Sequence, residues 1–175
     1  WSSDVCSSDL KSSRSSNILI LKSRISADRS FQGYNNTWST KLKRYAAIEN
    51  NVKAVSYSRS PIPQYIEKLK MNNIICIPTV GALKHAIKAE KLGADALVIQ
   101  GSEGGGHTGS TPTTLLLSSV LENVSVPVFA AGGFRDGYGL AAAKAWGAQG
   151  IAMGTRFMMT QESPVPENTK DAYLQ

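Results

Sequence analysis

The residues best suited to chemistry lie in one glycine-rich segment, residues 100–110, which reads Gln-Gly-Ser-Glu-Gly-Gly-Gly-His-Thr-Gly-Ser. The segment directly follows a short apolar run and contains five glycines and His107. Glycines let backbone N–H groups approach a ligand closely. An imidazole titrates near neutral pH, so His107 can accept or donate a proton during catalysis. The segment therefore predicts a ligand-binding loop with an acid–base histidine; the alternative is a histidine that only forms hydrogen bonds within a glycine loop.

Two further glycine-containing loops follow later apolar runs, at residues 130–134 and 152–155. Glycines after two successive late strands of an α/β protein are typical of a phosphate site built from backbone amides and a helix N-terminus. Tight turns are the alternative explanation. The candidate phosphate-binding residues are Gly132, Gly133, Ala152, Met153, Gly154 and Thr155. The first strand is not followed by the G-x-G-x-x-G pattern of a dinucleotide fold, and the sequence contains no cluster typical of metal ligands.

The remaining histidine and the two cysteines fit structural roles better. His85 lies beside Lys84 in a helical pattern, which indicates an exposed helix face. Cys76 lies inside an apolar run and is expected in the core. Together with Cys6 it cannot form a disulfide framework, so a reducing, cytoplasmic setting is expected.

Five apolar runs must position these loops, at residues 54–57, 74–77, 96–99, 126–130 and 150–153. Because the runs are continuous, they predict strands buried on both faces. Helical patterns occupy residues 63–71, 82–92, 113–124 and 139–146, with Thr113 or Thr114 as an N-cap and with Gly93 and Gly147 at two helix ends. The alternation predicts a parallel α/β sheet, either doubly wound or part of a (β/α)8 barrel, since a whole barrel needs about 250 residues. Residues 17–50 give a weak signal for one more strand–helix unit.

The net charge of +6 arises from the N-terminal part of the chain. Residues 1–70 hold twelve Lys and Arg against five Asp and Glu, whereas residues 71–175 hold seven against eight. Residues 1–30 contain eleven serines, which predicts an irregular tail, partly foreign to the fold, ahead of a domain at residues 31–175. Nucleic-acid binding is therefore not expected, and no apolar run has the length of a membrane span.

Residues 98–109, 127–137 and 150–157, in this order and spacing, closely resemble the nitronate monooxygenase (2-nitropropane dioxygenase-like) family. The resemblance covers roughly residues 50–165. It implies an FMN-dependent TIM barrel, related to flavin-dependent enoyl-acyl-carrier-protein reductases, of which this chain carries a C-terminal portion of about five βα units. It also implies that His107 is the catalytic acid/base, that Gln100 and Gly105 contact the flavin, and that Gly133 and residues 152–155 hold the FMN phosphate.

The activity implied by this resemblance is oxidation of nitronates or nitroalkanes by O2 to carbonyl compounds and nitrite. An alternative is an FMN-dependent, NAD(P)H-linked enoyl-thioester or acyl-CoA reductase or dehydrogenase. Ser58 stands where family members often carry a second histidine, and the glycine-rich loop resembles that of a subgroup with acyl-CoA-like substrates. A non-catalytic, phosphate-binding fragment is the alternative outside the enzymes.

Overall fold

The computed structural model describes residues 47–58, 63–106 and 108–174. The serine-rich tail and almost all of the expected unit at residues 17–50 lie outside the described residues. Of that unit, only residues 47–50 are described, and residues 47–49 are helical.

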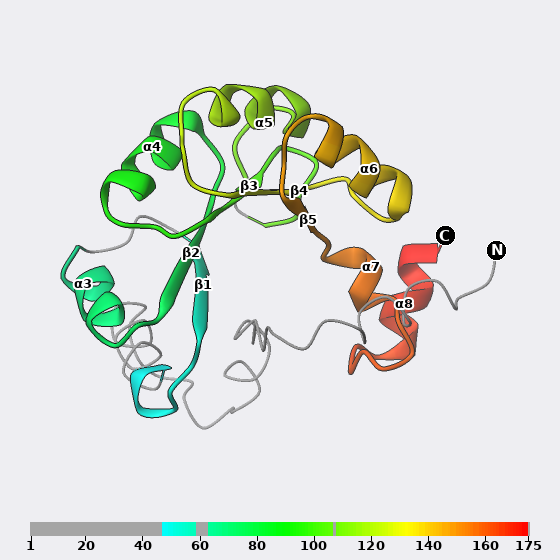
Figure 1. Cartoon of the computed structure of the whole chain (residues 1–175). Helices are drawn as coiled ribbons and strands as arrows, with labels where there is room; N and C mark the ends of the chain where they lie inside the picture. Colours follow the sequence, from blue (N-terminus) through cyan, green and yellow to red (C-terminus); the bar gives the residue numbers. More distant parts are fainter. Residues whose placement is uncertain (1–46, 59–62, 107, 175) are drawn as a thin grey trace.

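Five parallel strands form one sheet in the order β1-β2-β3-β4-β5. The strands are β1 (Ala54–Ser58), β2 (Ile75–Val80), β3 (Leu97–Gln100), β4 (Val128–Ala131) and β5 (Gly150–Ala152). Neighbours in the sheet are also neighbours in sequence, and Figure 1 shows the strands fanning out in an arc. A doubly wound sheet reverses the direction of its strand order at a switch point, and no reversal occurs among the five strands of the described residues. The arrangement is therefore an α/β fold consistent with part of a TIM barrel, as predicted.

A helix follows each strand. These helices are α3 (Pro63–Met71), α4 (Leu83–Lys91), α5 (Thr113–Leu121), α6 (Gly137–Ala145) and the short α7 (Thr155–Met158), with α8 (Glu167–Leu174) last in the chain. Helices α3 to α6 lie along the outer side of the arc (Figure 1). Gly93 and Gly147 follow α4 and α6 with φ of +90° and +105°, which confirms the predicted glycine ends.

The predicted N-cap of α5 is wrong. Pro112 occupies the cap position, and Thr113 is the first helical residue. Proline carries no side-chain acceptor, so the free N–H groups of this helix need a partner from elsewhere in the chain.

The core lies between the sheet and the outer helices, in two clusters. The smaller cluster packs Ile66 and Leu69 of α3 against Val55 and Cys76 of the first two strands. The larger cluster joins β2, β3 and β4 to α4, α5 and α6 through Val80, Ala86, Ala89, Leu97, Ile99, Leu116, Leu117, Val120, Val128, Ala130 and Ala143. A fully buried Leu, Ile or Val stabilises the fold by about 1.5–3 kcal/mol.

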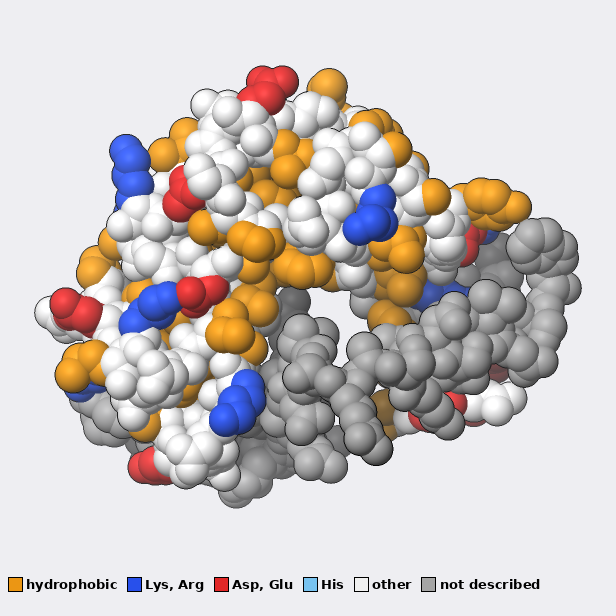
Figure 2. Space-filling view, viewed as in Figure 1, with side chains coloured by type: hydrophobic (Ala, Val, Ile, Leu, Met, Phe, Trp, Pro, Cys, Tyr) orange, Lys and Arg blue, Asp and Glu red, His pale blue; other side chains and the backbone are white. Residues whose placement is uncertain are grey.

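The strands are not buried on both faces, contrary to the prediction from their continuous apolar runs. Along β2, Cys76, Pro78 and Val80 are buried, whereas Ile75 is 47% exposed and Ile77 is half-buried. The difference arises because, within the described part of the chain, the helices α3 to α6 cover only the outer face (Figure 1). Figure 2 shows hydrophobic side chains exposed along the inner rim of the arc as well as between the helices.

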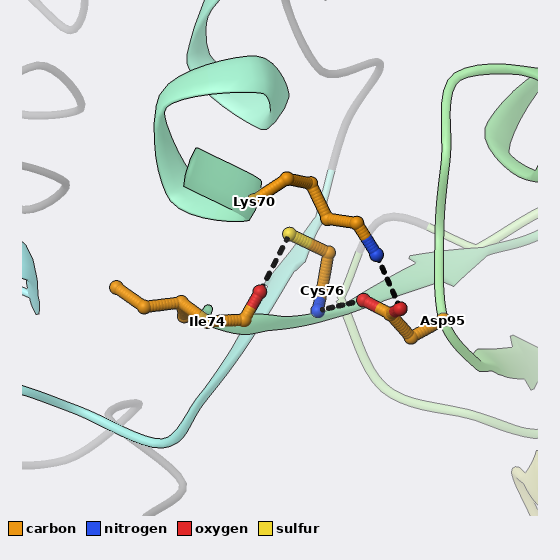
Figure 3. A network of polar contacts seen from close by, with 4 residues as sticks. All are labelled: Lys70, Ile74, Cys76 and Asp95. Atoms are coloured by element: carbon orange, nitrogen blue, oxygen red, sulfur yellow. Dashed lines mark hydrogen bonds and ion pairs between the residues drawn. The ribbon is translucent and has the colours of Figure 1, made fainter. Parts of the chain in front are cut away.

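A polar network joins strands and helix at the amino end of the sheet (Figure 3). The Asp95 carboxylate accepts a hydrogen bond of 2.8 Å from the Cys76 N–H and pairs with the Lys70 ammonium. The Asp95 N–H in turn donates to the Cys76 carbonyl at 2.9 Å. One carboxylate therefore ties α3, β2 and the segment before β3 together, at the end of the sheet opposite the glycine-rich loops. Among the described residues, no helix combines the length and hydropathy needed to cross a membrane.

Candidate functional site

The predicted site residues gather at the carboxyl ends of β3, β4 and β5. Gln100 pairs in register with Ala131, and Ala131 pairs with Ala152, so these residues form one row across three strands. Gly132 and Gly133 directly follow this row on β4, and residues 153–155 follow it on β5. In barrels and other parallel α/β proteins, this edge of the sheet is where ligands bind. The fold thus brings the two predicted phosphate loops side by side and next to the glycine-rich loop.

The Gln100 side chain folds back over the glycine-rich loop. Its Nε2 donates a hydrogen bond of 2.6 Å to the Gly105 carbonyl. A Cβ at Gly104 would lie 2.6 Å from Gln100 Cγ, so only glycine allows the side chain to cross the loop there. The two residues predicted to contact the flavin therefore contact each other.

Further contacts close the base of this loop. The Ser102 N–H donates to the Thr111 carbonyl at 2.9 Å, and a Cβ at Gly109 would collide with the Gly81 carbonyl that follows β2. His107 itself lies outside the described residues, and its role remains a prediction. The Thr108 N–H donates to the Gly106 carbonyl at 3.1 Å, so the two neighbours of position 107 are held close together.

Glu103 is a site residue that the sequence analysis missed. Its Oε2 accepts hydrogen bonds from the Thr113 hydroxyl at 2.8 Å and from the Thr113 N–H at 2.9 Å, and thus supplies the acceptor that Pro112 lacks at the start of α5. The Thr113 hydroxyl is the main reason that the pKa of Glu103 lies below its ordinary value, with help from backbone N–H groups. The role of Glu103 could have been inferred from the sequence by one signal. The helix has no capping side chain of its own, and a carboxylate lies ten residues before it.

The two predicted phosphate loops have a backbone suited to binding an anion. Gly132 and Gly133 have φ of +100° and +78°, conformations that side chains rarely adopt. Within the described part of the chain, no acceptor is found for the backbone N–H groups of Gly133, Phe134, Gly154 and Thr155. A Cβ at Gly154 would meet no described atom within 4 Å. Backbone N–H groups that have no described acceptor, beside open space, fit the phosphate of a mononucleotide such as FMN.

Asp136 is the N-cap residue of α6, the helix that follows the β4 loop. Its Oδ1 accepts a hydrogen bond of 3.1 Å from the Gly139 N–H and caps α6, so the helix begins at Gly137, two residues before the predicted helical pattern. This backbone hydrogen bond is the main reason that the pKa of Asp136 is lowered, and the neighbouring Arg135 adds to the effect.

The residues expected to be structural are placed accordingly. His85 lies on α4 and is exposed, and Cys76 is fully buried, both as predicted. Among the described residues, no three His, Cys, Asp or Glu side chains come together as a metal site would require.

A parallel sheet with helices outside and glycine-rich loops after its last three strands defines an α/β chain of TIM-barrel type. The chain belongs to the nitronate monooxygenase family, whose model matches residues 16–175.

Named relatives of this chain are oxidoreductases. It is 56% identical over 127 residues to (3aS,4S,5R,7aS)-5-hydroxy-7a-methyl-1-oxo-octahydro-1H-indene-4-carboxyl-CoA dehydrogenase of Rhodococcus jostii, a match that covers 73% of this chain and 36% of the relative. It is 41% identical over 124 residues to a probable nitronate monooxygenase of Staphylococcus aureus, covering 65% of this chain and 35% of the relative. The chain therefore spans about a third of the length of these curated relatives.

A solved structure confirms the fold. A FabK mutant from Thermotoga maritima superposes with a TM-score of 0.75 at 39% identity, over 79% of this chain and 47% of that protein. The relation to flavin-type oxidoreductases of this family agrees with the resemblance carried by the three glycine-containing motifs.

Proposed function

We propose that this protein is an FMN-dependent oxidoreductase that dehydrogenates an acyl thioester of coenzyme A. The observation that carries the substrate class is the 56% identity to a carboxyl-CoA dehydrogenase, against 41% for the probable nitronate monooxygenase. Ser58 at the exposed end of β1, where the wider family often has a histidine, supports the same choice.

FMN, when bound, would supply the two-electron redox chemistry. The N–H groups of Gly133, Phe134, Gly154 and Thr155 would hold its phosphate, and the row formed by Gln100, Ala131 and Ala152 would lie beneath it. The small side chains of Ala131 and Ala152 project little from this part of the row and leave room above it for the cofactor. The Gln100 amide, fixed on the Gly105 carbonyl, would present its remaining N–H and its oxygen to a polar edge of the cofactor.

His107 would take up the proton that leaves the substrate, and bound FMN would supply the acceptor for the hydride. The assignment rests on its place in the loop, directly after Gly105 and Gly106, whose surroundings contain no described atom within 4 Å of a hypothetical Cβ. A substrate could therefore approach this part of the loop closely.

Oxidation of nitronates by O2 is the second candidate. The match of the family model over residues 16–175 and the Staphylococcus aureus relative favour it. In that reaction His107 would remove the acidic α-proton of a nitroalkane or hold a bound nitronate.

Anaerobic mixing of the flavin-loaded protein with each substrate class separates these activities. Loss of flavin absorbance on adding a saturated or hydroxylated acyl-CoA supports the dehydrogenase. Loss only with a nitronate supports the second candidate, and loss only with NAD(P)H, followed by turnover of an enoyl thioester, supports the reductase direction.

Two histidine variants test the catalytic assignment. His107→Gln should slow flavin reduction by roughly 10²–10⁴-fold, the usual contribution of a general acid or base. His85→Gln, on the exposed face of α4, is the matched control and should leave the rate unchanged. Equal rates for both variants would refute the role of His107.

A further inference from the structure

Glu103 contacts three parts of the candidate site at once. Its carboxylate accepts from the N–H and the hydroxyl of Thr113, at 2.9 and 2.8 Å, at the start of α5. Its aliphatic stem lies against the β4 loop, because a Cβ at Gly133 would be 3.5 Å from Glu103 Cβ and 3.9 Å from Glu103 Cγ. Its own backbone belongs to the glycine-rich loop, four residues before His107.

Thr113 extends these contacts to the end of β4. It is 2% exposed, and its hydroxyl oxygen lies 3.3 Å from the Gly132 carbonyl and 3.4 Å from the Ala131 carbonyl. A hydroxyl has one proton, and the shortest contact directs it to Glu103. The hydroxyl therefore lies between the carboxylate and the phosphate loop.

The packing around this pair leaves little room for another arrangement. A Cβ at Gly132 would lie 2.9 Å from Thr113 Oγ1 and 3.0 Å from the Gly104 nitrogen, and a Cβ at Gly101 would collide with Thr113. The Gly101 N–H donates to the Ala131 carbonyl at 3.3 Å and so provides a backbone link between the two loops. Any movement of Glu103 would thus change how the glycine-rich loop sits on β4.

We propose that Glu103 is a positioning residue that, through Thr113, fixes the glycine-rich loop carrying His107 against the β4 loop at Gly132 and Gly133. It does not touch the reacting atoms; it sets the distance between the acid–base loop and the phosphate loop. The link to catalysis rests on the proposed function, whereas the mechanical coupling of the two loops does not.

Amide hydrogen exchange of the flavin-free protein tests the coupling itself. In Glu103→Ala, exchange at Gly101, Ser102 and Gly104 should accelerate at least about tenfold, because these N–H groups report the closed base of the loop and its contact with β4. Glu103→Gln keeps one acceptor oxygen for the Thr113 N–H and should restore most of the protection. Glu67→Ala, an exposed glutamate on α3, is the control and should leave exchange unchanged.

A purely local capping role predicts a different pattern. Exchange would then accelerate only in the first turn of α5, as at Leu116, whose N–H donates to the Pro112 carbonyl at 3.0 Å, and this outcome would overturn the proposal. Should Glu103→Ala unfold, Thr113→Val removes the hydroxyl while keeping its volume, and faster exchange at Gly101 is again the supporting result and unchanged exchange the opposing one.

FMN affinity, measured by quenching of flavin fluorescence, provides the second readout. Glu103→Ala should weaken FMN binding at least about fivefold, with Glu103→Gln between it and the wild type. Unchanged affinity in Glu103→Ala would overturn the positioning role at the phosphate loop. A wild-type protein that binds no flavin would refute the proposed function, and the exchange measurement would then decide on Glu103 alone.

Discussion

Alanine substitutions at three glycines of the candidate site can distinguish the cost of backbone strain from the cost of steric overlap. Gly105 has no left-handed φ, and a Cβ there would meet no described atom within 4 Å. Gly106 has the same open surroundings but a φ of +88°. Gly132 combines a φ of +100° with a Cβ position 2.9 Å from Thr113 Oγ1. Substituting alanine at each position adds these costs one at a time.

The magnitudes follow from these geometries. Gly105→Ala should change the free energy of unfolding by less than about 0.5 kcal/mol, or raise it slightly by restricting the unfolded chain. Gly106→Ala should lower it by about 1 kcal/mol, since left-handed strain costs roughly 1–2 kcal/mol and the unfolded-chain effect offsets part of this. Gly132→Ala adds overpacking of about 1–3 kcal/mol against the buried Thr113 to the same net strain, for a total loss of about 2–4 kcal/mol.

Urea unfolding of the flavin-free proteins measures all three, because ligand binding would otherwise add to the apparent stability. The loss in free energy of unfolding should be smallest for Gly105→Ala, larger for Gly106→Ala and largest for Gly132→Ala. A Gly132→Ala protein within about 0.5 kcal/mol of the wild type, or a Gly105→Ala protein as unstable as Gly132→Ala, would refute this description of the loops.

Three further predictions concern polar groups outside the glycines. Asp95→Ala should lower the free energy of unfolding by about 1–3 kcal/mol, because the Cys76 N–H loses its acceptor. Lys70→Gln should cost less than about 1 kcal/mol, since the side chains of this ion pair are 42% and 33% exposed; urea unfolding that gave the opposite order would contradict the network of Figure 3. Burial raises the pKa of the Cys76 thiol to about 11, so a Cys6→Ser protein should resist an aromatic disulfide reagent near about pH 8 until it is denatured, and rapid labelling of the native protein would be the contrary result. The folded-state pKa of Asp136 is lowered, so the stability it contributes is present above its ordinary pKa and is lost as the pH falls through the folded value. The stability difference between wild type and Asp136→Ala should therefore narrow on acidification, and a difference that does not change with pH would count against this cap.

The sheet and most of its helices were predictable because their signals are local. Each apolar run lies on or next to an observed strand, and the predicted helix at residues 63–71 matches α3. Gly93 and Gly147 mark helix ends through a backbone conformation that glycine alone adopts easily, so sequence reveals them directly. The predicted burial on both strand faces was wrong because burial depends on what covers the inner face. The sequence of a strand alone does not show which segments pack against it.

Tertiary contacts limited the prediction of the site. The carboxyl ends of β3 to β5 could be located from sequence, because parallel strands place their ends at one edge. Thr113 was wrongly assigned as a cap, since its hydroxyl and N–H both turn to Glu103 across the loop. The contact of Gln100 with Gly105 likewise depends on the path of the loop, which spacing alone does not define.

The most direct test of the account compares the affinities of FMN and riboflavin, which differ only in the phosphate. The N–H groups of Gly133, Phe134, Gly154 and Thr155, which have no acceptor among the described residues, would each donate to that phosphate. Hydrogen bonds to a charged group contribute about 1.5–3 kcal/mol each, so even two of them predict a preference for FMN of at least about 100-fold. Equal affinity for FMN and riboflavin, or no binding of either, would contradict the central claim that these two loops form a flavin phosphate site.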